Sequence, residues 1–511
     1  MSGPVLIGVD VGSSGAKAIA IDTQGRTLSQ GRSEYETSYP QNGWAEQDPE
    51  DWFAGACNAI RSCLRQGNFS PGEVQAIAFD GPAHNVALLG EDDRLLRSCI
   101  HWSDLRSIPE SSRLRDTSGD RIFTISGQPC NPSWTLSQLA WVRANQPDVW
   151  ARLAKILVTK DYVRYRFTGE YVTDPYDAVG TQLFDLSAGA WSDELCALID
   201  LDPRLLPRVL PSHASAGPLH ADVAAALGLP ASIAVAVGGG DSAVEAFGVG
   251  AVNPGDCVVK IGTSGCVNVV TRRPTPSPRT LTYPYLLDDL GFTIAVTSNG
   301  TAALRWLRSS VLAPAEMSFE QVVDLAGAAP AGANGLIFHP YMMGERTPYW
   351  DPRLRGAFIG LSVRHGLADL ARAVLEGVAF SLRDCLETVK AMGLTTRSMS
   401  LLGGGSRSPL WASIAASVLN CDLRKPDTDD AALGAALLAG VGCGVFPDWS
   451  AAARHTSDAT QVIKPDPRDA ATYDRYFEVF RASARDIAPH YHALYELSRE
   501  GEPRTRERHR H

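Results

Sequence analysis

A Gly/Ser turn near the start of the chain is bounded by one acid and one cation. The stretch GVDVGSSGAKAIAI (8–21) places strand-like residues on both sides of a turn, with Asp10 before it and Lys17 after it. Such a turn can present backbone N–H groups and small hydroxyls to an anion, although the G-x-x-x-x-G-K-[ST] spacing is absent. A carboxylate among apolar neighbours is costly to bury unless a cation meets it. Mg²⁺ on nucleotide phosphates would satisfy Asp10, with Lys17 offsetting phosphate charge, and the alternative is an Asp10–Lys17 ion pair across the hairpin.

Three more Gly-rich stretches follow apolar runs, at 238–240, 262–265 and 403–405. Each is expected at the end of a strand, where a turn can bind an anion. Any one of them taken singly is more simply explained as a tight turn that needs a positive φ. Four such turns in an acidic chain together indicate a polyphosphate ligand.

Asp241 directly follows three glycines in VGGGDSAVEAF and opens an expected helix. A helix N-terminus keeps a carboxylate ionised, which suits a base that accepts a proton from a hydroxyl. Asp is also a favoured N-cap residue. Both roles stay open, because capping and catalysis are compatible.

Alternating strand-like and helix-like segments must position these turns, which predicts an α/β fold. The stretch VVKIGTSGCVNVVT (258–271) repeats the strand, turn and strand of the opening, with Gly262 standing 250 positions after Gly12. This repeat predicts a structural duplication. A segment rich in Pro, Ala, Ser and Gly at 211–233 predicts a domain boundary near residue 245.

Composition narrows the class of protein. The chain has 511 residues, of which 44% are hydrophobic and 20% charged, so two domains are expected. Its formal charge of −10 argues against nonspecific binding to nucleic acid or to an anionic membrane, and favours small-molecule partners. The sequence shows neither a signal-like start nor a membrane-spanning run, which predicts a cytoplasmic protein. Ten scattered cysteines without a C-x-x-C pair predict reduced thiols, so that a metal would have oxygen ligands.

Nine ordered segments carry a resemblance to a known family. They are GVDVGSSGAKAIAID, GWAEQDPEDWF, HWSDLRS, VTKDYVRYRFTGEYVTDPYDAVGTQLFD, VGGGDSA, IGTSG, YMMGERTPYWDP, GAFIGLSVRHGLADLARAVLEG and LLGGGSRSPLWASIAA. Through them the chain resembles the FGGY carbohydrate kinases, and most of all their xylulokinase branch, to about residue 475. The resemblance implies two actin-like ATPase (ribonuclease H-like) domains with a cleft between them. Residues 1–245 would form the N-terminal domain, 246–478 the C-terminal domain, and 479–511 a C-terminal helix with a disordered tail.

The resemblance also assigns roles to the chemistry-bearing residues. Asp241 matches the catalytic base, which takes the proton of the substrate hydroxyl as it attacks the γ-phosphate of ATP. Asp10 matches the Mg²⁺-associated carboxylate. The first phosphate loop corresponds to Ser13, Ser14, Gly15 and Lys17, the second to Gly262 and Thr263, and the adenosine-contacting turn to Gly404, Gly405 and Ser406. The helix beyond that turn contains Gly434, where close approach is expected.

On the sugar side, GPAHN (81–85) stands where xylulokinases carry Gly-Gln-Met-His-Gly. His84 agrees with that pattern and can bond a hydroxyl or the keto oxygen, whereas Ala83 replaces a large side chain. Trp102 and Asp104 match a W-x-D segment near the sugar, with core packing as the alternative for Trp102. Ser242 replaces an Asn beside the base, so the pocket is expected to differ in shape.

The expected activity is therefore ATP- and Mg²⁺-dependent phosphorylation of a terminal hydroxyl of a ketopentose, with D-xylulose as the first candidate. The alternative within the family is a kinase for ribulose, erythritol or another sugar alcohol. An alternative of another class is an actin-like or chaperone-like ATPase that acts on a protein partner. The family often forms dimers, so a homodimer is compatible with the resemblance.

Overall fold

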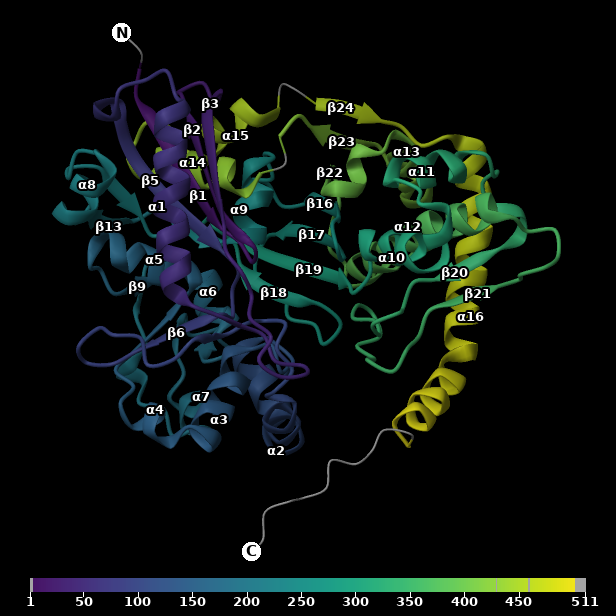
Figure 1. Ribbon diagram of the computed structural model, residues 1–511, viewed down its shortest axis with the longest axis horizontal. Helices are drawn as coiled ribbons and strands as arrows, with labels where there is room; N and C mark the ends of the chain where they lie inside the picture. The colour runs from purple at the N-terminus through teal and green to yellow at the C-terminus, as the bar shows by residue number, and fades with distance from the viewer. Residues whose placement is uncertain (1–2, 429, 458–459, 501–511) are drawn as a thin grey trace, which may run out of the picture. The chain divides into compact units, whose positions relative to one another are not determined.

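The computed structural model describes residues 3–428, 430–457 and 460–500. It divides into two compact units that interleave in sequence (Figure 1). Unit 1 comprises residues 1–256, 269–293 and 426–460, and unit 2 comprises 257–268, 294–425 and 461–511. The sequence predicted two consecutive domains that meet near residue 245. Each unit is instead built from three separate stretches of the chain. The tail expected to be disordered falls largely on 501–511, which lies outside the described residues.

A seven-stranded sheet forms the centre of unit 1. Its order is β13 (Ser215–Pro218), β14 (Ala234–Ala236), β5 (Val74–Gly81), β1 (Val5–Val11), β2 (Gly15–Ile21) and β3 (Thr27–Glu34), and β15 (Gly239–Gly240) also pairs with β5. Strands β1 and β2 form the antiparallel hairpin expected around the first Gly/Ser turn. Strands β1 and β5 are parallel, with Asp10 opposite Asp80.

Helices cover both faces of this sheet (Figure 1). The odd-numbered residues of β1 belong to the core packed against α1 (Pro49–Gln66). The even-numbered face packs against α14 (Ala431–Gly442), where a Cβ on Gly8 would clash with the backbone of Ala432. Asp10 and Asp80 therefore share the face that α14 covers.

The next helix along that face, α9 (Asp241–Gly248), begins with the expected base and packs against α14. A Cβ on Gly434 would clash with the carbonyl of Val244 on α9. Gly434 thus allows α14 and α9 to approach each other closely, whereas its expected place beside the adenosine turn stays a prediction.

Smaller elements of unit 1 surround the sheet. They are β4 (Glu46–Gln47), β6 (Val86–Leu89), β7 (Cys99–Ile100), α2 (Ile108–Ser126), α3 (Thr135–Asn145), α4 (Pro147–Ala151), β8 (Lys155–Val158), α5 (Thr159–Thr168), β9 (Val172–Thr173), α6 (Pro175–Gly180), β10 (Phe184–Asp185), β11 (Ala190–Trp191), α7 (Asp193–Ala197), β12 (Arg208–Val209), α8 (Ala221–Leu227) and α15 (Trp449–Ser457).

The second seven-stranded sheet has the order β18 (Leu281–Pro284), β19 (Gly291–Thr297), β17 (Gly265–Thr271), β16 (Asp256–Ile261), β22 (Ser398–Leu402), β23 (Leu423–Pro426) and β24 (Thr460–Ile463). Strands β16 and β17 flank the second Gly/Ser turn, as β1 and β2 flank the first. The predicted repeat is thus present as two strand–turn–strand segments, one in each large sheet.

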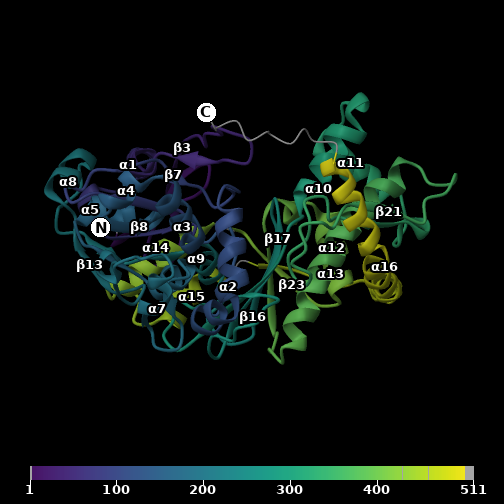
Figure 2. The same ribbon diagram turned by 90° about the horizontal axis from the view of Figure 1, so that it is seen from below.

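Unit 2 also contains helices and a short strand pair. These are α10 (Thr301–Trp306), α11 (Phe319–Gly327), β20 (Ile337–His339), β21 (Ala357–Ile359), α12 (Leu367–Ala391), α13 (Pro409–Leu419) and α16 (Pro467–Glu500). Helix α12 packs against α13, and α13 against α16 (Figure 2). Within the described ranges no helix has the length and apolar character needed to cross a membrane. The predicted α/β class is confirmed.

Candidate active site

The first Gly/Ser turn is fixed by donors that hold its carbonyl oxygens. Tyr35 donates its hydroxyl to the Gly12 carbonyl and its N–H to that of Ser14. Gln47 Nε2 donates to the Ser13 carbonyl at 2.7 Å. Because carbonyl oxygens would repel a phosphate, their engagement by the protein favours an anion at this turn.

Lys17, at the far side of the turn, forms an ion pair with Asp430. Asp430 caps α14, accepting a hydrogen bond from the Ala432 N–H at 3.0 Å. Asp10 is the register partner of Lys17 in the hairpin. The ion pair with Asp430 therefore ties the first phosphate hairpin to the start of α14.

Asp241 is partly buried in the first turn of α9, with Gly240 at the cap position. Its Oδ1 accepts the backbone N–H of Ser242 at 2.6 Å and the Ser242 hydroxyl at 3.2 Å. These bonds favour the ionised form that a base requires. The structure thus gives Asp241 a first-turn position and leaves the cap itself to glycine.

Tyr176 of α6 supports this arrangement from outside the helix. It contacts the Ser242 side chain, and its ring stacks on Tyr283 with centroids 4.2 Å apart and planes at 14°. Burial raises the pKa of Tyr176 well above its ordinary value, so the phenol stays protonated. A Cβ on Gly240 would clash with the Tyr176 ring, which explains the glycine before the base.

Asp80 is a carboxylate of this region that the sequence interpretation missed. It lies between Asp10 and Gly239 in the register of the sheet, and it is fully buried. Burial, followed by the charges of Asp10 and Asp241, raises its pKa well above the ordinary range. The signal that could have found it is the one used for Asp10, an acid at the end of an apolar strand.

His84 lies in the loop that follows β5, in a left-handed conformation with φ of 79°. Its Nδ1 lies 2.6 Å from the Gly180 carbonyl, and its ring meets Trp134 edge-on with centroids 4.0 Å apart. A carbonyl only accepts, so Nδ1 carries the proton. Burial lowers the pKa of His84 to about 4, which leaves a neutral ring whose Nε2 accepts hydrogen bonds. Such a ring can accept from a hydroxyl but does not donate to a keto oxygen through Nε2.

The other sugar-side residues adjoin His84. Ala83 is buried beside Gly180, where an added Cβ would come within 3.1 Å of the Ala83 methyl group. Trp102 exposes 41% of its surface and donates its backbone N–H to Asn85 Oδ1 at 2.6 Å. Its indole Nε1 reaches Ser13 Oγ at 3.1 Å. Trp102 thus joins the loop after β5, which holds His84 and Asn85, to the first phosphate turn.

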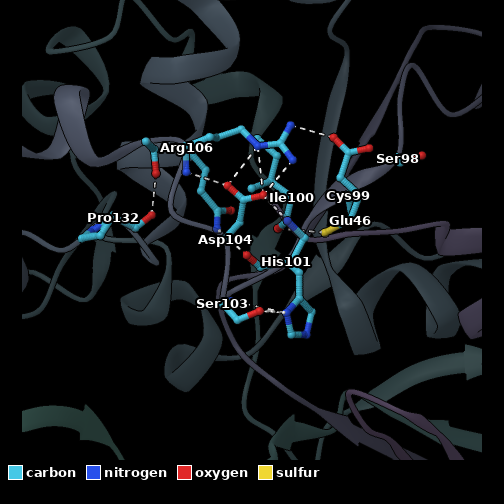
Figure 3. Close-up of polar contacts among 12 residues, drawn as sticks. Glu46, Ser98, Cys99, Ile100, His101, Ser103, Asp104, Arg106 and Pro132 are labelled. Carbon is cyan, nitrogen blue, oxygen red and sulfur yellow. Dashed lines mark hydrogen bonds and ion pairs between the residues drawn. The ribbon is translucent and has the colours of Figure 1, made fainter. Parts of the chain in front are cut away.

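Asp104 is fully buried in an ionic network (Figure 3). Its Oδ2 accepts from Arg106 Nη2 at 2.7 Å and from the Ala45 N–H at 2.5 Å. Arg106 also donates to Glu46 at 2.6 Å and lies 3.7 Å from the centroid of the Trp44 ring. The carboxylate that the sequence placed at the sugar is therefore already engaged by a guanidinium.

Unit 2 brings the second phosphate turn and the adenosine turn together. The carbonyls of Gly262 and Thr263 accept from Thr301 and Ala302 at 2.7 and 3.2 Å, so this turn too has its carbonyls held by the protein. A Cβ on Gly405 would clash with Ile261, the last residue of β16. Ser406 is buried and donates to the Gly403 carbonyl at 2.7 Å, whereas Gly404 and Thr263 are exposed.

The predicted site residues fall into two groups. Unit 1 holds the proposed base, the acid Asp10, the first phosphate turn and the sugar-side residues, and unit 2 holds Gly262, Thr263, Gly404, Gly405 and Ser406. Carboxylate oxygens suit a magnesium ion, and Asp80 adds two oxygens that no donor reaches among the described residues. The residues present in unit 1 therefore fit a divalent cation.

Two family models together match most of the chain. The N-terminal domain of the FGGY family of carbohydrate kinases matches residues 5–248, and the C-terminal domain matches residues 257–443. The xylulose kinase of Staphylococcus epidermidis is 32% identical over 482 residues, which cover 94% of this chain and 96% of that protein.

Solved structures give the same picture. A "xyloylose kinase" from Brucella ovis has a TM-score of 0.89 and 34% identity, covering 96% of this chain and all of that one. A gluconate kinase from Lactobacillus acidophilus has a TM-score of 0.91 and 26% identity, covering 96% of this chain and 99% of its own. Proteins with different named substrates thus share this fold.

Proposed function

We propose that this chain, which belongs to the FGGY family of carbohydrate kinases, transfers the γ-phosphoryl group of ATP to a terminal hydroxyl of D-xylulose. The observation that carries the reaction type is the placement of Asp241 at the start of α9, in the unit that also holds the first phosphate turn and His84. The xylulose kinases that resemble the chain over nearly its full length favour this sugar.

In this proposal Asp241 accepts the proton of the attacking hydroxyl. Its Oδ1 is held by Ser242, so Oδ2 is the oxygen assigned to that proton. The carboxylate must be ionised beforehand, which the helix N-terminus and the two donors of Ser242 favour. The positions of the proton acceptor and the hydroxyl determine the rate, because phosphoryl transfer depends mainly on alignment and charge.

Phosphates are assigned to the two turns whose carbonyls the protein engages. Ser13, Ser14 and Gly15 would bind through N–H groups and hydroxyls in unit 1, and Gly262 and Thr263 in unit 2. Lys17 contributes positive charge near the first turn, held in place by Asp430. The exposed Gly404, with Gly405 and Ser406, would contact adenosine. Magnesium, when bound at Asp10, supplies charge neutralisation to the phosphates.

The sugar is assigned to His84 and Trp102. Neutral His84 accepts from a hydroxyl at Nε2, and the exposed Trp102 covers the C–H surface of the sugar. Asp104 acts on this site through the loop that it fixes. A homodimer, compatible with the family, is a further prediction for light scattering in solution.

A second candidate is a family kinase for ribulose, erythritol or another sugar alcohol. Two small side chains favour it. Ala83 lies beside His84, and Ser242 donates to Asp241 at the position where the resemblance leads one to expect the longer side chain of Asn. A coupled assay of ADP release over a panel of ketoses and polyols separates the two. D-Xylulose should give the highest kcat/KM, and a much higher value for a polyol with little turnover of xylulose would contradict the leading proposal.

A further inference from the structure

Asp80 lies beside Asp10 at the centre of unit 1. The two residues are register partners on the parallel strands β5 and β1, and they share the face that α14 covers. Asp80 has no exposed surface, and its carboxyl lies in direct contact with that of Asp10. Two acids thus meet side by side on neighbouring strands of the sheet.

Neither carboxylate oxygen of Asp80 is satisfied by a protein donor. Apart from the Asp10 carboxyl, which lies within hydrogen-bonding reach, no protein group among residues 3–428, 430–457 and 460–500 reaches Oδ1 or Oδ2. The buried lysine of this region, Lys160, lies 2.6 to 3.0 Å from three other carboxylates, those of Asp161, Asp174 and Asp177. It is therefore engaged elsewhere.

Further negative charge surrounds the pair. Asp241 and the buried Glu245, one turn later on α9, both act on Asp80 through their charges. A buried carboxylate without a donor is costly, and neighbouring acids increase that cost. A cation held between Asp80 and Asp10 removes the cost, because carboxylate oxygens are the ligands that hard divalent cations take.

The first Gly/Ser turn lies against the carboxylate of Asp10. Gly12 has no side chain, and a Cβ there would lie 3.3 Å from the Gly15 carbonyl oxygen and 3.6 Å from both carboxylate oxygens of Asp10, so a side chain at this position would crowd those oxygens. Over the described residues, no three His, Cys, Asp or Glu side chains are arranged to hold a metal together. Magnesium is typically bound by one or two carboxylates, and water or phosphate oxygens complete its coordination shell.

We propose that Asp80 and Asp10 together bind one divalent cation directly through their carboxylate oxygens, in the absence of nucleotide. The resemblance assigned the metal to Asp10 alone, so Asp80 is a new ligand. The inference deepens the proposed function and rests on it only for the role of the ion, since binding itself needs neither sugar nor ATP.

The test uses the full chain with Mn²⁺ as the probe and neither nucleotide nor sugar. Free Mn²⁺ is followed by its electron paramagnetic resonance signal, and the melting temperature is recorded with and without the ion. The wild type should bind one Mn²⁺ per chain and melt higher with it. Asp80→Asn should weaken binding at least tenfold and abolish the shift, because it removes the charge at nearly constant volume.

Glu245→Gln is the matched control, because it removes one buried charge of the same region without removing a ligand. It should change Mn²⁺ affinity far less than Asp80→Asn does, and Asp80→Ser serves if the Asn variant does not fold. Two results would overturn the proposal. One is a wild-type protein that does not bind Mn²⁺ in the absence of nucleotide, and the other is an Asp80 variant that binds Mn²⁺ as tightly as the wild type. Neither result would bear on sugar phosphorylation, which the substrate panel measures separately.

Discussion

The indole Nε1 of Trp102 donates a hydrogen bond to Ser13 Oγ at 3.1 Å, across 89 positions of sequence. The backbone N–H of Trp102 also donates to the Asn85 side chain, so one residue links the first phosphate turn with the loop after β5 that holds His84. In a kinase these two regions must present phosphate and hydroxyl to each other. The link therefore bears on alignment as well as on sugar binding.

Trp102→Phe should lower kcat/KM by about 2- to 10-fold, the loss expected for one partly exposed hydrogen bond with its packing. Ser13→Ala should lower it similarly, and the double variant should lose little more than either single variant, because both remove the same bond. Steady-state kinetics of the four proteins measure the coupling. Fully additive losses would show that the two side chains act independently.

Asp241→Asn should lower kcat by about 10²- to 10⁴-fold, because the amide does not accept the hydroxyl proton. ATP binding should persist, since the carboxamide keeps the shape of the residue. Rapid-quench measurement of sugar phosphate, with ATP affinity from calorimetry, checks both statements. Normal ATP binding together with wild-type turnover would remove Asp241 from the role of base.

Tyr176→Phe should leave the ring stack on Tyr283 intact while removing the hydroxyl that contacts Ser242. We expect kcat to fall by several-fold, because Ser242, which donates to Asp241, loses its contact with Tyr176. The KM for the sugar should be nearly unchanged. The melting temperature should change little. A large rise in KM with constant kcat would instead assign Tyr176 to the sugar pocket.

Asp104→Asn tests whether this carboxylate is structural. The variant leaves the buried Arg106 with a weaker partner, and breaking a buried ion pair costs about 3–5 kcal/mol. We therefore expect a clear drop in the free energy of unfolding in urea. A variant with wild-type stability and a raised KM for the sugar would show that Asp104 contacts the substrate directly.

The buried histidines predict a loss of stability in mild acid. Burial lowers the pKa of His84, His101 and His339 to about 4 each, whereas the unfolded value is about 6.5. Between these values the unfolded chain binds more protons, so the stabilisation is full above about pH 6.5 and falls as pH drops towards 4. Urea unfolding at several pH values measures the slope. His84→Gln should reduce it, because one of the three groups no longer titrates.

The glycine turns, the hairpin repeat and Asp241 could be predicted from the sequence, because local residue order specifies them. Asp80 follows an apolar strand as Asp10 does and could have been noticed for that reason, but only the register of β1 and β5 shows that the two carboxyls meet. Sequence alone likewise gave no reason to pair Lys17 with Asp430. Asp104 was selected because it matched a motif, but in the structure its carboxylate accepts hydrogen bonds from Arg106. Such partners depend on long-range packing, which no spacing pattern records.

The contact of Gly8 with Ala432 also has a consequence for the order of folding. Strand β1 emerges first from the ribosome, but the helix that covers its Gly8 face is encoded more than 400 residues later. Until α14 has been synthesised, that face of the nascent sheet has no cover from this helix. Unit 1 can therefore be completed only late in translation. In a nascent chain that stalls before residue 431, this apolar surface would stay uncovered, so that chaperones could bind it and the chain could aggregate through it.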